Sequence, residues 1–186
     1  TTSPCRSPHA CAHCSPQYMG KQETKIRRIV RSGLRNGLRV FRMALTMSFQ
    51  CGPGLAERYD VLKRAWQRLT ESYELKNLRQ NYDMSYIRIL EETIGPKGWF
   101  PHFHVIFVCS SGVEREHLEK VLQKWASFID DKGSYARQHS QTVDEITSSV
   151  GKGGVERYVT KQRYFSLDFD SQGWNPQSYQ ISPMLL

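Results

Sequence analysis

The chain has 186 residues, and its 26 lysines and arginines against 18 aspartates and glutamates give a formal net charge of +8. This length favours a single domain, and an apolar content of 39% with four tryptophans excludes wholesale disorder. No apolar run approaches the roughly 20 residues that cross a bilayer, and no signal segment opens the given sequence, so we expect neither a transmembrane nor a secreted protein. The basic surplus favours a polyanionic partner without identifying it.

Cysteines are concentrated at the start of the sequence. Three of the five lie within the first 14 residues, whereas Cys51 and Cys109 stand alone. An odd, clustered set is a poor disulfide framework and a better metal knuckle, so we expect a cytoplasmic protein. Four residues could bind a structural Zn²⁺: Cys5, His9, Cys11 and Cys14.

The zinc prediction leaves alternatives open. His13 could replace the histidine ligand, Cys51 could complete the site, and a reduced, disordered tail would bind nothing. We expect residues 1–20 to form this knuckle and residues 21–186 to form the main domain. Because the sequence does not begin with Met and ends abruptly on an apolar segment, we expect a longer parent protein.

The expected elements follow in chain order. The predicted helices cover residues 21–38 in patches, then 55–73 and 118–129 by apolar stripes at three- and four-residue spacing, and 155–164. The predicted strands cover residues 39–49, 86–93, 99–108 and, on a weaker pattern, 138–146, with a hairpin turn at 95–98. This order predicts an α+β fold: a mostly antiparallel, ferredoxin-like or RRM-like split βαβ sheet with helices packed on it.

A histidine pair marks the strand over 99–108. His102 and His104 are two residues apart, so both imidazoles project from the same sheet face, and Phe103 points to the other face. Glu91 belongs to the neighbouring hairpin strand, where Glu92 would face away. Two imidazoles and one carboxylate suit a catalytic divalent cation, with Mn²⁺ or Mg²⁺ as candidates. The alternative for the histidines is that they merely happen to lie on a half-buried strand. The alternative for Glu91 is an exposed strand carboxylate.

A tyrosine and a lysine share one side of the last predicted helix. Tyr158 and Lys161 are three residues apart. A phenol is a weak nucleophile unless a cation or base assists it, and Lys161 offers that cation or a grip on a phosphate. The alternative is a tyrosine that only packs.

Several motifs in register resemble a known family. The string 98–104, Gly-Trp-Phe-Pro-His-Phe-His, resembles the His-hydrophobic-His (HUH) signature of plasmid rolling-circle replication initiators with one catalytic tyrosine. Residues 45–48 resemble the first family motif, residues 90–93 the acidic strand, residues 158–161 the Tyr-x-x-Lys motif, and residues 182–186 the segment after it. The resemblance spans about residues 5 to 186.

The resemblance implies a metal-dependent endonuclease and strand transferase that nicks one DNA strand at a plasmid origin. Tyr158 would form a 5′-phosphotyrosine and release a 3′-hydroxyl that primes synthesis, while His102, His104 and Glu91 would hold the metal. The implied partners are single-stranded or hairpin origin DNA, a host helicase and a DNA polymerase, with no membrane. Some members carry Glu four residues before the tyrosine, where this chain has Gly154, so nicking is better supported than termination.

A run of arginines follows the cysteine segment and could contact DNA phosphates or form a solvated face; its members are Arg27, Arg28, Arg31, Arg35, Arg39 and Arg42. Two other hypotheses remain. One is a non-catalytic, zinc-containing module that stacks nucleic-acid bases on Trp99, Phe103 and Tyr158. The other is an HUH transposase or relaxase, which the single Tyr-x-x-Lys frame disfavours.

Overall fold

The computed structural model describes residues 14–49, 54–95, 98–129, 134–135, 141–147 and 167–170. The helices are α1 (Cys14–Arg35), α2 (Leu55–Glu71), α3 (Tyr73–Asn81) and α4 (Arg115–Ile129). The strands are β1 (Arg39–Leu45), β2 (Ser48–Phe49), β3 (Ser85–Gly95), β4 (Gly98–Cys109), β5 (Ser134–Tyr135), β6 (Thr142–Glu145) and β7 (Leu167–Asp170). None of the described helices has the length and apolar character needed to span a bilayer.

The main sheet is antiparallel and has the strand order β6-β1-β4-β3-β7. Its first four strands follow each other along the chain as β1, β3, β4 and β6, with helices between β1 and β3 and between β4 and β6. That arrangement is the split βαβ plan, so the predicted α+β, ferredoxin-like fold is confirmed. β2 and β5 form a separate two-stranded sheet.

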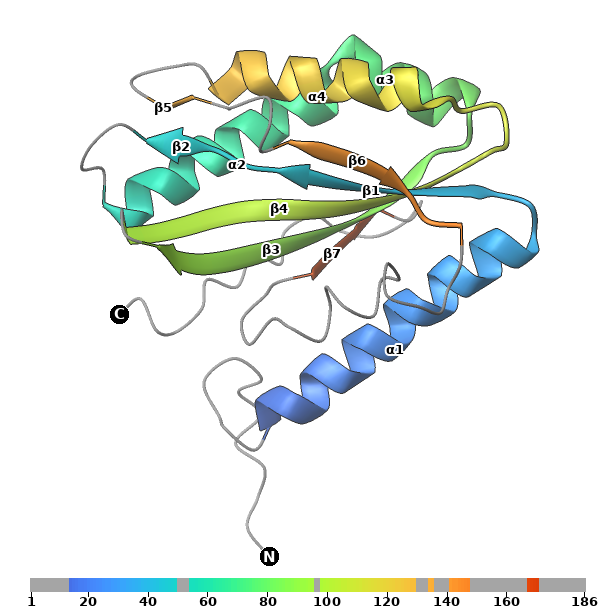
Figure 1. Cartoon of the computed structure of the whole chain (residues 1–186), viewed down its shortest axis with the longest axis horizontal. Helices are drawn as coiled ribbons and strands as arrows, with labels where there is room; N and C mark the ends of the chain where they lie inside the picture. Colours follow the sequence, from blue (N-terminus) through green and yellow to red (C-terminus); the bar gives the residue numbers. More distant parts are fainter. Residues whose placement is uncertain are drawn as a thin grey trace, which may run out of the picture.

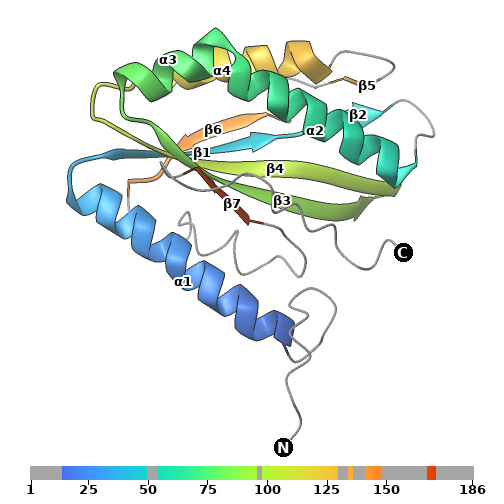
Figure 2. The ribbon, with the colours of Figure 1, turned by 180° about the vertical axis from the view of Figure 1, so that it is seen from behind.

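Helices lie on both sides of the sheet. α2, α3 and α4 cover one face and α1 crosses the other (Figure 1), and the view from behind shows the same layers (Figure 2). Strand alternation divides the buried side chains accordingly. The larger core, under α2 to α4, includes Phe103, Phe107 and Trp125, and a smaller core unites Ile26 and Val30 of α1 with the sheet's opposite face.

Two glycines let α1 pack against that face. Gly33 is buried, and a Cβ there would meet Cγ1 of Val108 at 3.1 Å, so a larger side chain would push the helix away. Gly37 follows the helix with a φ of +72°, a conformation that glycine adopts without steric cost. The chain can then turn directly from α1 into β1.

Three predicted elements differ in extent. The strand expected over 39–49 ends at Leu45, and residues 48–49 belong to the small sheet. The single helix expected over 55–73 breaks at Ser72, whose hydroxyl accepts a hydrogen bond from the Leu75 amide and caps α3, so Tyr73 is 78% exposed. α1 begins at Cys14 and runs unbroken through residue 20, where the sequence suggested a boundary.

The remaining expected elements divide between the described and undescribed parts. The strands expected over 86–93, 99–108 and 138–146 correspond to β3, β4 and β6, and the helix over 118–129 to α4. The helix expected over 155–164 and nearly all of the cysteine segment lie outside the described residues.

Candidate metal centre

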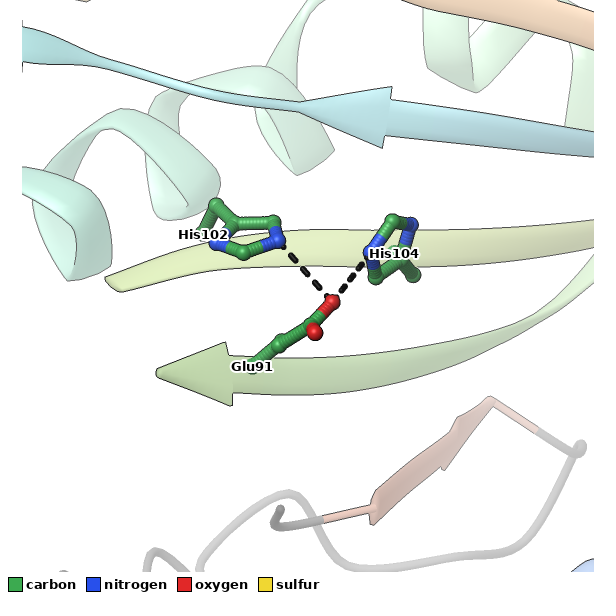
Figure 3. A group of neighbouring side chains, drawn as sticks. All are labelled: Glu91, His102 and His104. Atoms are coloured by element: carbon green, nitrogen blue, oxygen red, sulfur yellow. Dashed lines mark hydrogen bonds and ion pairs between the residues drawn. The ribbon is translucent and has the colours of Figure 1, made fainter. Parts of the chain in front are cut away.

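Three side chains converge on one face of the β3–β4 hairpin. The antiparallel register places Glu91 directly opposite His102, and His104 follows two residues further along β4. Figure 3 shows the carboxylate reaching toward both rings: Glu91 Oε2 lies 3.0 Å from His102 Nε2 and 2.5 Å from His104 Nε2. One ligand atom from each residue lies within 4.8 Å of the other two. The expected clustering of these three residues on one face is confirmed.

Alternation sends the intervening residues to the other face, as expected. Phe103, between the histidines, is buried in the larger core against Trp66 and Trp125. Glu92, next to Glu91, accepts a hydrogen bond from the hydroxyl of Tyr59 on α2. Burial raises the pKa of the Glu92 carboxyl. The hairpin therefore has a polar face that carries Glu91, His102 and His104, and a packed face on the other side.

The cluster is shielded from solvent. The side chains of Glu91, His102 and His104 are 19%, 15% and 10% exposed. Burial by itself would raise the pKa of the Glu91 carboxyl, but hydrogen bonds and charge from His102 and His104 outweigh it and hold that pKa well below its usual value. The site therefore favours an ionised carboxylate facing two imidazoles.

The tautomer of His102 supports cation binding. Its Nδ1 lies 3.1 Å from the carbonyl oxygen of Phe100. A carbonyl only accepts, so Nδ1 carries hydrogen, and without a second proton the ring would direct the lone pair of Nε2 toward Glu91 Oε2. A lone pair facing a carboxylate requires a positive charge between them, either a proton or a metal ion. A backbone carbonyl behind a histidine is also the usual outer partner of a metal ligand.

The donor set fits a divalent cation. Two imidazole nitrogens and one carboxylate oxygen are typical of first-row ions such as Mn²⁺, and three protein ligands leave positions for a substrate. The three residues would hold such an ion through Nε2 of His102, Nε2 of His104 and Oε2 of Glu91.

The tyrosine and zinc predictions fall mostly outside the described part of the chain. Tyr158 and Lys161 belong to residues that the structure does not describe, as do Cys5, His9 and Cys11. Cys14 is the first residue of α1 and is partly buried. These assignments stay predictions.

The predicted arginine run divides into two groups. Arg27 pairs with Glu23, Arg39 with Glu114 and Glu145, and Arg42 with Asp144. The other three lie on α1, where Arg28 and Arg35 are exposed and Arg31 is partly buried. Three of the six predicted arginines therefore form ion pairs with carboxylates, and the other three lie along α1.

The stacking residues of the non-catalytic alternative were wrong in part. Phe103 is 4% exposed and cannot stack a base, whereas Trp99 is 38% exposed and its stacking role stays a prediction. Alternation places Trp99 on the α2 face, away from Glu91, His102 and His104. Phe100, two residues before His102, shares the cluster's face and is partly buried. Phe100 was not predicted, although the two-residue spacing that pairs the histidines also places it on their face.

Further basic residues were missed on α1. Lys21 and Lys25 join Arg28, Arg31 and Arg35 at three- and four-residue spacing, and we call these five the basic stripe. The only acidic residue of this helix, Glu23, pairs with Arg27. Helical periodicity through the lysines, rather than a search for arginines alone, would have found the stripe.

Comparisons with models of protein families, with curated proteins and with solved structures found no match.

Proposed function

We propose that the protein is a metal-dependent HUH nuclease that nicks one strand of a replication origin and starts rolling-circle synthesis. The observation that carries the proposal is the convergence of Glu91 Oε2 on Nε2 of both His102 and His104. The cluster lies on a hairpin of a ferredoxin-like sheet, and the motif order along the sequence supports the same family. The proposal implies a cytoplasmic location and, as partners, origin DNA, a helicase and a DNA polymerase.

Each residue has a distinct role in the proposed reaction. Glu91, His102 and His104 would hold a divalent cation, which would supply Lewis-acid polarisation of the scissile phosphate. Tyr158 Oη attacks the phosphorus, giving up its proton to solvent, while Lys161 offers its positive charge to the phenolate or the phosphate. The bond from phosphorus to the 3′ oxygen breaks, and that oxygen takes up a proton to become the primer hydroxyl.

The phosphotyrosine conserves the energy of the broken bond, so rejoining the strand requires no nucleotide. In this proposal the 5′ end stays on Tyr158 until a second strand attacks it. Gly154 occupies the position where some family members carry an activating glutamate. The proposal therefore covers nicking and strand transfer, and the termination step requires another group.

The basic stripe is the proposed DNA-contact surface. α1 lies on the side of the sheet to which the metal-ligand cluster points, because Ile87 and Ile89 pack beneath the helix and share a strand face with Glu91. α1 carries six basic residues and one acidic residue, whereas α2, α3 and α4 mix nine basic with six acidic ones. A strand entering the metal site would meet the more positive side of the protein.

A nicking assay with a tyrosine variant tests the proposal. Wild-type protein with Mn²⁺ and an origin oligonucleotide should form a covalent adduct visible on a denaturing gel, and EDTA should abolish it. Tyr158→Phe should bind the oligonucleotide without forming an adduct, whereas Tyr164→Phe, six residues along, should react normally. An adduct that persists in Tyr158→Phe would refute the nucleophile assignment, and EDTA-resistant nicking would refute the metal role.

The non-catalytic alternative makes the opposite prediction for the same gel. Such a module would bind the oligonucleotide with no adduct in any variant and with no dependence on Mn²⁺.

A further inference from the structure

Part of the β3–β4 hairpin extends beyond the sheet. β4 pairs with β1 only as far as Phe103, and β3 pairs with β7 only as far as Ile89. Past those positions, residues 90–95 and 98–102 pair with each other and with no other strand of the described chain. We call these two segments the ribbon.

Two of the three cluster residues lie on the ribbon. Glu91 and His102 face each other across it, whereas His104 still has Ala44 of β1 beside it. A two-stranded ribbon is marginally stable by itself in water. The positions of Glu91 and His102 relative to His104 therefore depend on what holds the ribbon.

The start of α2 contacts both strands of the ribbon. The Tyr59 hydroxyl donates a hydrogen bond to Oε1 of Glu92 on β3, and the Arg58 guanidinium donates to the carbonyl oxygen of Trp99 on β4. Both views of the ribbon diagram show α2 beginning over the end of this hairpin (Figures 1 and 2). Two consecutive residues of one helix thus hold both strands from the face opposite the cluster.

The contacts lie close to the ligands along the chain and are partly shielded from water. Glu92 directly follows Glu91, and its neighbour across the ribbon, Pro101, directly precedes His102. Arg58 is only 8% exposed, and Pro101 and Arg58 are both buried. A shift of the Glu92 backbone would therefore move the Glu91 carboxylate with it, and a hydrogen bond in this shielded position is stronger than one in open water.

We propose that Tyr59 and Arg58 are positioning residues that hold the ribbon so that Glu91 and His102 converge on the same point as His104. This inference rests on the metal site of the proposed function. It assigns to α2, which contacts the ribbon at Glu92 and Trp99, control over the geometry of the three ligands. A contact that only stabilised the fold would lower the melting temperature without changing metal affinity.

The test compares two tyrosine hydroxyls. Tyr59→Phe removes the ribbon contact, and Tyr82→Phe is the matched control because the Tyr82 hydroxyl lies 3.3 Å from His117 Nε2, at the end of the helical layer where β3 begins. Arg58→Met is a second variant, which releases β4. Amide hydrogen exchange in EDTA reports on the ribbon itself, and Mn²⁺ titration of the full chain reports on ligand geometry.

We expect Tyr59→Phe to speed exchange of the ribbon amides about tenfold, the effect of one lost hydrogen bond. It should also weaken Mn²⁺ binding about tenfold, the low end of the loss seen when a group that orients metal ligands is removed. Arg58→Met should act in the same direction, and Tyr82→Phe should leave both quantities within twofold of wild type. Unchanged ribbon exchange in both α2 variants would overturn the inference, as would faster exchange with unchanged Mn²⁺ affinity.

Failure of the proposed function would give a different result from failure of this inference. A wild-type chain that binds no Mn²⁺ would refute the metal site, and with it the ligand-positioning role, even if the exchange data showed that α2 holds the ribbon.

Discussion

Replacing Glu91 with glutamine separates the charge of the cluster from its shape. The amide keeps the size of the carboxylate but removes the negative charge that both imidazoles contact at 3.0 and 2.5 Å. Hydrogen bonds to charged groups contribute about 1.5–3 kcal/mol each, and the 19% exposure of Glu91 calls for a value near the lower end for the pair. We therefore expect Glu91→Gln to lower the unfolding free energy by about 2 kcal/mol at pH 7 in EDTA.

For a chain of this length, about 2 kcal/mol corresponds to a fall in melting temperature of roughly 4–8 °C. The pKa of Glu91 is lowered in the folded state, so its stabilisation is present above the ordinary carboxyl pKa and is lost as pH falls through the folded value. The difference between wild type and Glu91→Gln should therefore shrink below about pH 4.5. Mn²⁺ should widen it, because metal binding raises only the wild-type melting temperature appreciably.

Differential scanning calorimetry at several pH values, with EDTA or with Mn²⁺, measures these differences. Equal melting temperatures in EDTA at pH 7 would contradict the electrostatic reasoning. An equal rise of both proteins with Mn²⁺ would show that the metal binds elsewhere.

Two further predictions concern DNA binding, measured by fluorescence anisotropy in EDTA so that no cleavage occurs. Phe100→Ala should weaken binding of a single-stranded origin oligonucleotide about tenfold, because a base stacked on an aromatic ring contributes about 1–3 kcal/mol; unchanged affinity would contradict a stacking role. Neutralising three exposed members of the basic stripe should reduce the slope of log K against log salt by about 2, at roughly 0.7 per phosphate contact. That variant is Lys21→Gln, Arg28→Gln and Arg35→Gln. The control variant replaces three exposed basic residues of the opposite helical layer: Arg64→Gln, Lys76→Gln and Lys120→Gln. An equal loss of salt dependence in this control would show that the DNA contact is not specific to α1.

The clustering of Glu91, His102 and His104 could be predicted because it depends on local rules. The two-residue spacing of His102 and His104 fixes a common face on any strand, and a short turn at 95–98 fixes which neighbouring residue lies opposite. The register then follows from counting outward from the turn, which brings Glu91 to His102. The four-strand plan could also be predicted, because most of the strands and helices show their own hydrophobic periodicity in the sequence.

Long-range contacts explain where the sequence prediction failed. The strand expected to continue to residue 49 ends at Leu45 because the Gln141 side chain accepts a hydrogen bond from the Thr46 amide and donates one to its carbonyl oxygen. The Trp125 indole donates to the same carbonyl. These hydrogen-bond partners of Thr46 lie 79 and 95 residues away along the chain, so no local sequence pattern predicts them.

The boundaries of two helices illustrate competing local signals. Tyr73 continues the apolar spacing of α2, but Ser72 is a favourable cap and ends that helix. Near the start of the chain, residues 1–20 were expected to form a cysteine knuckle, yet α1 begins at Cys14. Pro16 lies in its first turn, where a missing amide hydrogen costs nothing.

The electron spin-echo spectrum of Mn²⁺ bound to the protein tests the proposed metal centre without relying on activity. One Mn²⁺ per chain should show modulation from two histidine nitrogens, and His102→Ala or His104→Ala should leave one. A bound ion without histidine modulation, or modulation unchanged in both variants, would contradict the assignment of Glu91, His102 and His104 as a metal centre.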